Sequence, residues 1–310
     1  MKEVKKELIP KNLLDFEKMF TTEMQCIGYI ISLKFDDDYH CPKCQSKKYW
    51  ILRTYTFKCG NCSNRESILK DTIFEGKSKP LMLYFRAIWY VVSQKNGSNA
   101  MNIQRILGLG SYNTAWSWLH KLRQAMISLD IKKLSGKVEV DETLIGGPGT
   151  GERKRGRGTK KLLIAVAVEI NKGLGRIRMR YIKDASADSL HSFIQNNVAK
   201  ASNLRTDDWK GYYGIEDKGY SREVHKSKKD DDELEHVHLV ASLLKRWLIG
   251  TLQGSYSPKY IDSYLDEFVF RFNRRNSKDR GLLFYRLMET AVKKPPTTTE
   301  TIKKEQNSEK

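Results

Sequence analysis

Four of the five cysteines form two C-x-x-C pairs, and this spacing constrains the fold of the N-terminal part more than any other feature. The pairs are Cys41-Pro-Lys-Cys44 and Cys59-Gly-Asn-Cys62, with 14 residues between them. Four thiolates at this spacing suit a tetrahedral zinc ion, which has no open coordination position and is therefore structural. With the β-like runs between the pairs, this predicts a zinc ribbon over residues 38–75. The alternative is a set of ordinary buried cysteines, which rarely adopt this spacing; Cys26 is expected to be a small core residue.

Residues 78–130 carry three helical patterns, after a short N-terminal helical segment over residues 1–37. Pro80 opens the first pattern, and the turn Gly108-Leu-Gly110 precedes the last, for which Ser111 is a good N-cap. This outline is that of a helix-turn-helix, whose last helix enters the major groove of DNA. A helical linker bundle is the alternative. The residues of the last helix that lie off its apolar stripe, and are expected to meet DNA, are Asn113, Thr114, Ser117 and Lys121.

The pattern changes near residue 137, from helical spacing to strands followed by helices. Strand signals cover residues 138–141, 162–168, 176–182 and 203–207, and helical signals cover 186–198, 236–249 and 257–273. This order predicts an α/β domain over residues 136–290. Residues 291–310 hold almost no apolar side chains and are expected to be disordered.

A set of polar residues far apart in sequence is the candidate active site. Asp141 ends the strand-like run that begins at Lys137, and Asp207 follows a later extended segment. His238 and Lys245 are two helical turns apart on one amphipathic helix, so they share a face about 10 Å apart. Two carboxylates at strand ends with a third ligand on a late helix are typical of a divalent-metal site for phosphoryl transfer. Glu139 and Asp208 are alternative ligands, because Glu139 shares a strand face with Asp141 and Asp208 adjoins Asp207.

The charge balance indicates a polyanionic partner. The chain has 56 Lys and Arg against 37 Asp and Glu, a net charge of +19, and nucleic acid is the usual partner of such a chain. Basic residues concentrate after Gly146, in a loop expected to contact phosphates or simply to be solvated; they include Arg153, Lys154, Arg155 and Arg157. No apolar stretch is long enough for a membrane span, and no secretory signal is expected. The paired cysteines then indicate a reducing, cytoplasmic compartment.

Taken together, these segments resemble bacterial insertion-sequence transposases of the ISXO2-like group, over roughly residues 15–290. The resemblance covers the cysteine quartet, two segments of the third helix, the strand with the first acid and several later segments: Ser111–Trp116, Leu119–Arg123, Val138–Thr143 with Gly146-Gly147, Thr206-Asp207, Leu243–Trp247, Gly250-Thr251 and Tyr264–Arg275.

This resemblance implies an RNase H-like catalytic core of the DDE type. The two acids map to Asp141 and Asp207, the third position maps to His238, and the basic residue seven positions on maps to Lys245. The family implies two Mg²⁺ or Mn²⁺ ions, and imidazole suits Mn²⁺ or Zn²⁺ better than Mg²⁺. Glu233 or Glu235 is an alternative source of a carboxylate.

The implied reaction is strand cleavage by water followed by strand transfer to target DNA, without a covalent protein–DNA intermediate. Lys245, with Arg246 beside it, would hold a phosphate near the scissile bond. Terminal inverted repeats would be bound by the zinc ribbon and the helical module, by at least a dimer on DNA, at the bacterial nucleoid. The alternatives are a transposase-derived DNA-binding regulator without catalytic activity and a metal-dependent nuclease that does not join ends.

Overall fold

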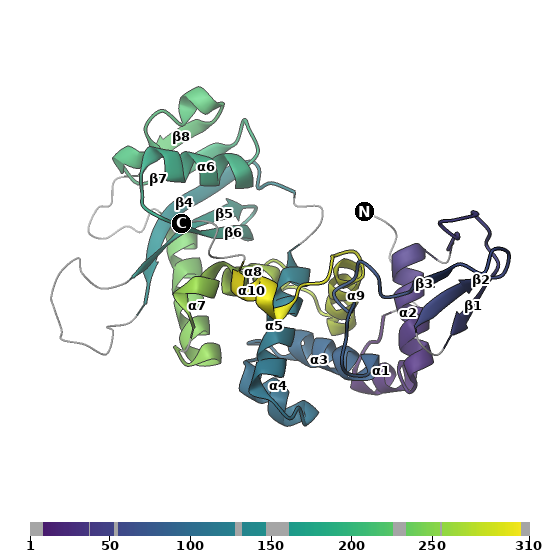
Figure 1. Cartoon of the computed structure of the whole chain (residues 1–310). Coiled ribbons are helices and arrows are strands. Elements are labelled where there is room, and N and C mark those ends of the chain that lie inside the picture. The colour runs from purple at the N-terminus through teal and green to yellow at the C-terminus, as the bar shows by residue number, and fades with distance from the viewer. Residues whose placement is uncertain are drawn as a thin grey trace. The chain divides into compact units, whose positions relative to one another are not determined.

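The fold was analysed in a computed structural model, which describes residues 9–36, 38–52, 55–127, 132–146, 161–225, 234–254 and 256–304. The chain divides into two compact units, each described here by itself. Unit 1 consists of Met1–Leu129 together with Asn276–Lys310, and unit 2 is the intervening segment Asp130–Arg275 (Figure 1). None of the helices within the described ranges has the length and apolar character needed to cross a membrane.

Unit 1 is built around a cluster of aromatic side chains from helices that are distant in sequence. The N-terminal helices are α1 (Leu13–Met19) and α2 (Glu23–Phe35), the latter opened by a capping box between Thr22 and Gln25. Phe16 stacks on Trp89 at 5.0 Å and meets Phe284 edge-on at 5.5 Å. These contacts join the expected N-terminal helical segment to α3 (Leu81–Ser93) and α9 (Arg280–Ala291) in one core.

The cysteine-rich segment forms a three-stranded antiparallel sheet in the order β1-β2-β3. Its strands are β1 (Tyr49–Leu52), β2 (Thr56–Cys59) and β3 (Arg65–Ser67). Phe57 is fully buried on one side of the sheet, where it stacks on Tyr39 with ring centroids 4.0 Å apart. One face of this small sheet therefore packs on the unit's own aromatic residues.

The helical module contains the three helices that the sequence predicts. After α3 come α4 (Ala100–Leu107) and α5 (Tyr112–Met126). Gly108 ends α4 with a φ of +61°, a left-handed conformation that favours glycine, and the Ser111 hydroxyl accepts a hydrogen bond from the Asn113 N–H at 3.2 Å. The tight turn between α4 and α5 follows from these two residues.

The C-terminal segment differs from the expected boundaries. Helix α9 belongs to unit 1 rather than to the α/β domain, which ends at Arg275 instead of residue 290. A disordered tail was expected over residues 291–310; the structure describes residues 291–304, which include α10 (Thr299–Lys304), and residues 305–310 lie outside the described residues. Ile302 is only 4% exposed, and the Thr297 hydroxyl bonds to the Gln124 side chain on α5. A few well-placed contacts order a segment whose composition is mostly polar.

Unit 2 is an α/β domain with a five-stranded mixed sheet in the order β6-β5-β4-β7-β8. Strands β4, β5 and β6 are antiparallel neighbours, whereas β4–β7 and β7–β8 are parallel. The strands are β4 (Lys137–Ile145), β5 (Leu162–Ile170), β6 (Leu174–Ile182), β7 (Asn203–Thr206) and β8 (Ser221–Val224), and the helices are α6 (Ala187–Asn197), α7 (Glu235–Leu252) and α8 (Ile261–Phe272). This arrangement is that of an RNase H-like core, as expected.

The sheet of unit 2 is covered on both faces, which explains the unbroken apolar run of β5. Ile164, Val166 and Val168 pack with α7 and α8, whereas Ala165 and Ala167 face α6 (Figure 1). Strands buried on both faces lose the alternation of apolar and polar residues. Short 3₁₀ turns at Lys210–Tyr212, Glu216–Lys218 and Pro258–Tyr260 complete the unit.

The outer edge of β6 is closed by side chains of α8 and the residue that follows it. Asn273 bonds both backbone groups of Ile177, accepting from its N–H at 2.7 Å and donating to its carbonyl at 3.1 Å. Asp262 accepts from the Tyr181 N–H at 2.9 Å. The backbone groups that an edge strand usually leaves open are thus occupied at these two residues.

Candidate active site

Asp141 lies on β4, and Asp207 directly follows the neighbouring strand β7, where the pairing of the two strands ends. The parallel pairing ends at Glu139 and Arg205, and Asp141 and Asp207 each follow two residues after their member of this last pair. Neighbouring strands are about 4.8 Å apart. The sequence suggested that Asp141 ends its strand. Strand β4 in fact continues to Ile145, so Asp141 lies within it. The open position beside Asp141 arises because β7 stops at Thr206.

The electrostatics agree with this proximity. Burial is the main cause that raises the pKa of Asp141, and the negative charge of Asp207 raises it further. The side chain of Asp141 is 20% exposed, so water reaches it from one side only. A buried carboxylate whose ionisation is disfavoured by a neighbouring negative charge is one that a bound cation would stabilise.

His238 reaches the same site from α7. Its Nε2 lies 3.1 Å from Asp141 Oδ2, and its side chain is 49% exposed. The three side chains that the sequence singled out, Asp141, Asp207 and His238, are therefore brought to one place by β4, by the end of β7 and by the first turn of α7.

Glu139 fixes the first turn of α7 against the sheet. Its fully buried carboxylate accepts hydrogen bonds from Arg205 Nη1 at 2.8 Å, from the Val237 backbone N–H at 2.9 Å and from His236 Nδ1 at 3.1 Å. Helix α7 has no capping side chain at Leu234. The start of a helix leaves several backbone N–H groups unpaired, and Glu139 accepts a hydrogen bond from one of them, that of Val237. Glu139, which the sequence offered as an alternative metal ligand, thus has a carboxylate that is hydrogen-bonded to protein groups.

Glu142 is a member of this site that sequence reasoning missed. Burial, together with the charges of Asp141 and Asp207, raises its pKa to about 7, although the hydrogen bond from Tyr212 acts in the opposite direction. The Tyr212 hydroxyl donates to Glu142 Oε1 at 2.5 Å. Its only signal in the sequence is its place directly after Asp141, because Tyr212 is distant along the chain.

The other candidate residues take different positions. Asp207 Oδ1 accepts from the Trp209 N–H at 3.1 Å, whereas the exposed Asp208 accepts from the Tyr213 hydroxyl at 3.2 Å. Lys245 and Arg246 are exposed on α7, beyond His238. Glu235 is exposed at the start of α7, and Glu233 lies outside the described residues.

Carboxylate oxygens with one imidazole suit Mg²⁺ or Mn²⁺ in chemistry, and the repulsion between Asp141 and Asp207 fits a cation between them. The ligand atoms are not gathered as tightly as in a preformed site. Within the described ranges, only the cysteine quartet has three or more potential ligand atoms within 4.8 Å of one another. Residues that fit the ions are present, without the close spacing that bound ions impose.

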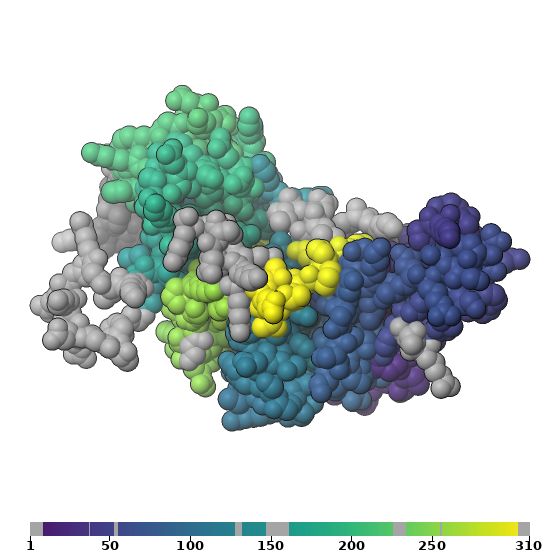
Figure 2. Space-filling model, in the orientation of Figure 1, coloured from purple at the N-terminus to yellow at the C-terminus, as the bar shows by residue number. Residues whose placement is uncertain are grey.

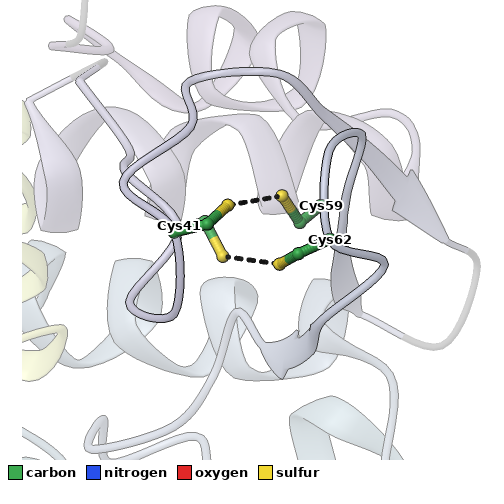
Figure 3. Close-up of side chains that lie close together, drawn as sticks. Cys41, Cys59 and Cys62 are labelled. Atoms are coloured by element: carbon green, nitrogen blue, oxygen red, sulfur yellow. Dashed lines mark hydrogen bonds between the residues drawn. The ribbon is translucent and has the colours of Figure 1, made fainter.

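The cysteine quartet does have the spacing of a zinc site. Cys41 Sγ lies 3.6 Å from Cys62 Sγ, and Cys44 Sγ lies 3.5 Å from Cys59 Sγ (Figure 3). A tetrahedron with Zn–S bonds of 2.3 Å has sulfur atoms about 3.8 Å apart. Hydrogen bonds from the backbone N–H groups of Cys62 and Asn61 lower the pKa of Cys59 to about 6, which favours the thiolate that zinc binds. The quartet fits the expected zinc ribbon, and Cys26 is buried away from it in α2.

The residues expected to contact DNA are only partly available. Asn113 is exposed, and Thr114 and Lys121 are half-buried. Ser117 is only 7% exposed and bonds to Thr299 Oγ1 of α10 at 2.9 Å, so it is covered in this structure and its DNA contact stays a prediction. The C-terminal segment covers the side of α5 on which Ser117 lies. Arg153, Lys154, Arg155 and Arg157 lie outside the described residues.

Comparison with known proteins gives one family and several solved structures. Residues 133–273 match the family described as ISXO2-like transposase domain. The BIV integrase catalytic core is similar at 18% identity, over 46% of this chain and 85% of that one, with a TM-score of 0.30. The pre-cleavage Mos1 transpososome is similar at 13% identity, over 72% of this chain and 78% of that one, with a TM-score of 0.31. Among proteins with curated descriptions, none matches this sequence.

Proposed function

We propose that this chain, whose residues 133–273 form an ISXO2-like transposase domain, cleaves the ends of a mobile DNA element and joins them to target DNA by metal-dependent phosphoryl transfer. The observation that carries the proposal is the convergence of Asp141, Asp207 and His238, with His238 Nε2 3.1 Å from Asp141 Oδ2. A transposase needs such a set of metal ligands where a phosphodiester can enter from solvent.

Asp141, Asp207 and His238 would hold the two divalent ions, Mg²⁺ or Mn²⁺, that the reaction uses. When bound, such ions activate water or a DNA 3′-hydroxyl and stabilise the leaving oxygen. Glu139 holds the first turn of α7, so that His238 is positioned before DNA arrives. Because the metal and the DNA hydroxyl supply the chemistry, no serine or tyrosine nucleophile is required.

Lys245 and Arg246 would contact the DNA backbone beside the carboxylates. Both are exposed on α7, and Lys245 lies two helical turns from His238, about 10 Å along the helix axis. A cation at that distance would hold a phosphate near the scissile bond. Their role is to position the strand, since phosphate contacts carry no sequence information.

Unit 1 would bind the terminal inverted repeats, through the zinc ribbon and the helical module. The first turn of α5, with Asn113 exposed, is the part of the helical module that remains open for base contact. Two ends have to be cut in concert, so we expect at least a dimer on DNA. The place of action would be the bacterial cytoplasm, at the nucleoid.

Two other functions are kept because of His238. An imidazole in place of the third carboxylate favours a DNA-binding regulator without catalysis or, failing that, a nuclease that cuts but does not join. Asp207 and Asp208 are adjacent carboxylates with different hydrogen-bond partners, so they provide a matched pair of variants for a test of catalysis.

The test is an end-cleavage and end-joining assay with Mg²⁺ and with Mn²⁺. We expect Asp207→Asn to lose both reactions by at least a hundredfold while it still binds DNA, and Asp208→Asn, the matched control, to keep them. Cleavage without joining would identify a nuclease. DNA binding without either reaction in the wild-type protein would identify a regulator.

A further inference from the structure

We propose that the solvent-facing side of the zinc-ribbon sheet is a duplex-DNA contact surface. This surface, called the ribbon face below, consists of Lys48, Trp50, Lys58 and Arg65. The proposal rests on the proposed function in its choice of DNA as partner, and it assigns that contact to named side chains on one face of one sheet.

Strand register places these residues side by side. Trp50 on β1 pairs with Lys58 on β2, which in turn pairs with Arg65 on β3, so the three form a row across the sheet. Paired residues on neighbouring strands point to the same face. Lys48 precedes Trp50 by two positions and extends the face, and a Cβ at Gly60 would lie 3.1 Å from the Lys48 Cβ.

The ribbon face is open, whereas the opposite face of the same sheet is filled. Trp50 is 58% exposed, and Lys48 and Arg65 are also exposed. On the other side, Phe57 is fully buried against Tyr39. The ribbon, in dark blue, lies at the surface of unit 1 in the space-filling view (Figure 2). An exposed tryptophan on the unfilled face is therefore not explained by packing.

The charge of the ribbon face is of one sign. The three strands contain one acidic residue, Glu66, which points to the filled side and accepts a hydrogen bond from Tyr39 at 3.2 Å. Within the described part of the chain, no ion pair involves the side chains of Lys48, Lys58 or Arg65. Three cations that have no carboxylate partner among the residues the structure describes match a polyanion better than a protein surface of mixed charge.

The tryptophan adds a second feature that suits DNA. Lys58 Nζ lies 5.9 Å from the centroid of the Trp50 ring, within the range of a cation–π contact, which keeps the cation beside the indole. A planar ring flanked by cations can lie against the sugar edge of a groove while the cations meet phosphates on either side. An apolar protein partner would instead require more apolar residues around Trp50.

The test compares DNA affinity of full-length variants across a range of salt concentrations. In the double variant Lys58→Ala/Arg65→Ala, we expect the slope of log K against log[salt] to become shallower by about 2, because each phosphate contact contributes about 0.9. Trp50→Ala should weaken binding about fivefold to tenfold, as expected for a lost aromatic contact, and leave the slope unchanged. Zinc content is measured in each variant to verify that the ribbon is folded.

The matched control removes the same charge elsewhere in unit 1. Lys11 lies just before α1 and Lys18 lies on it, and both are exposed. The double variant Lys11→Ala/Lys18→Ala should leave the slope near that of the wild type. An unchanged slope in Lys58→Ala/Arg65→Ala, or an equal change in the control, would overturn the proposal. Binding is read without cleavage, so an inactive wild-type protein would refute the catalytic function alone and leave this result interpretable.

Discussion

Glu139 and Val237 are 98 positions apart and are joined by a hydrogen bond from the Val237 backbone N–H to the Glu139 carboxylate, at 2.9 Å. Glu139 lies on the same strand as Asp141, and Val237 directly precedes His238. The bond thus connects the two elements that carry the first acid and the imidazole. The position of His238 depends on a residue that takes no part in the proposed chemistry.

Replacing Glu139 should therefore cost stability as well as geometry. Glu139→Ala leaves Arg205, which is 16% exposed, without its buried carboxylate, and we expect the free energy of unfolding of unit 2 to fall by about 3 kcal/mol. Denaturant unfolding measures this. The control is Glu223→Ala. Like Glu139, Glu223 contacts a histidine, in its case His225, but its side chain is 45% exposed, so its loss should cost less than about 1 kcal/mol. Equal losses in both variants would contradict the role given to Glu139.

The cysteine quartet should hold one zinc ion per chain. We expect a strong chelator to remove it and to raise hydrogen exchange in β1, β2 and β3, because binding energy of a structural zinc is folding energy, while unit 2 stays protected. Cys59→Ser should not retain zinc. Cys26→Ala is the control, since Cys26 is buried outside the quartet, and it should keep the full zinc content. Unaltered exchange after zinc removal would show that the ribbon does not need the metal.

His120 predicts a pH dependence of unit 1. Burial lowers its pKa from 6.5 to about 3, with a further contribution from Arg123. The unfolded chain therefore binds a proton below pH 6.5 that the folded chain does not, and stability falls as pH falls from 6.5 towards 3. Between pH 7 and pH 5 the loss should be about 2 kcal/mol. Unfolding curves of the wild type and of His120→Gln check this, and the difference between the two pH values should shrink in the variant.

The C-terminal segment should contribute to the stability of unit 1. Ile302 is 4% exposed, and its truncation in Ile302→Ala should lower the free energy of unfolding by about 2 kcal/mol and raise hydrogen exchange in α5. Glu300→Ala, at an exposed position of the same helix, should change neither. Normal stability of Ile302→Ala would mean that α10 packs only weakly.

Local patterns in the sequence were sufficient for several elements. The C-x-x-C spacing predicted the quartet whose sulfur atoms lie within 4.8 Å of one another, and the Gly108 turn predicted the boundary between α4 and α5. The apolar run over residues 162–168 predicted a strand, which is β5. These features depend on residues that are close in sequence, or on burial of a whole strand, so periodicity and spacing can reveal them.

Contacts between distant segments were beyond such patterns. Ser117 lies off the apolar stripe of α5, yet it is buried because Thr299 covers it. Residues 297–302 are mostly polar and order themselves through contacts with α5. The raised pKa of Glu142 depends on burial and on the charges of Asp141 and Asp207, and its hydroxyl partner, Tyr212, is distant in sequence. In each case the decisive partner is supplied by the fold.

The bonds from Asn273 and Asp262 to the backbone of β6 also determine how copies of this chain can come together. A strand from another molecule cannot extend the sheet at Ile177 or Tyr181 unless it first displaces these side chains. Extension of the sheet past β6 is thereby hindered at these two residues, and a multimer built across this edge needs contacts of another kind.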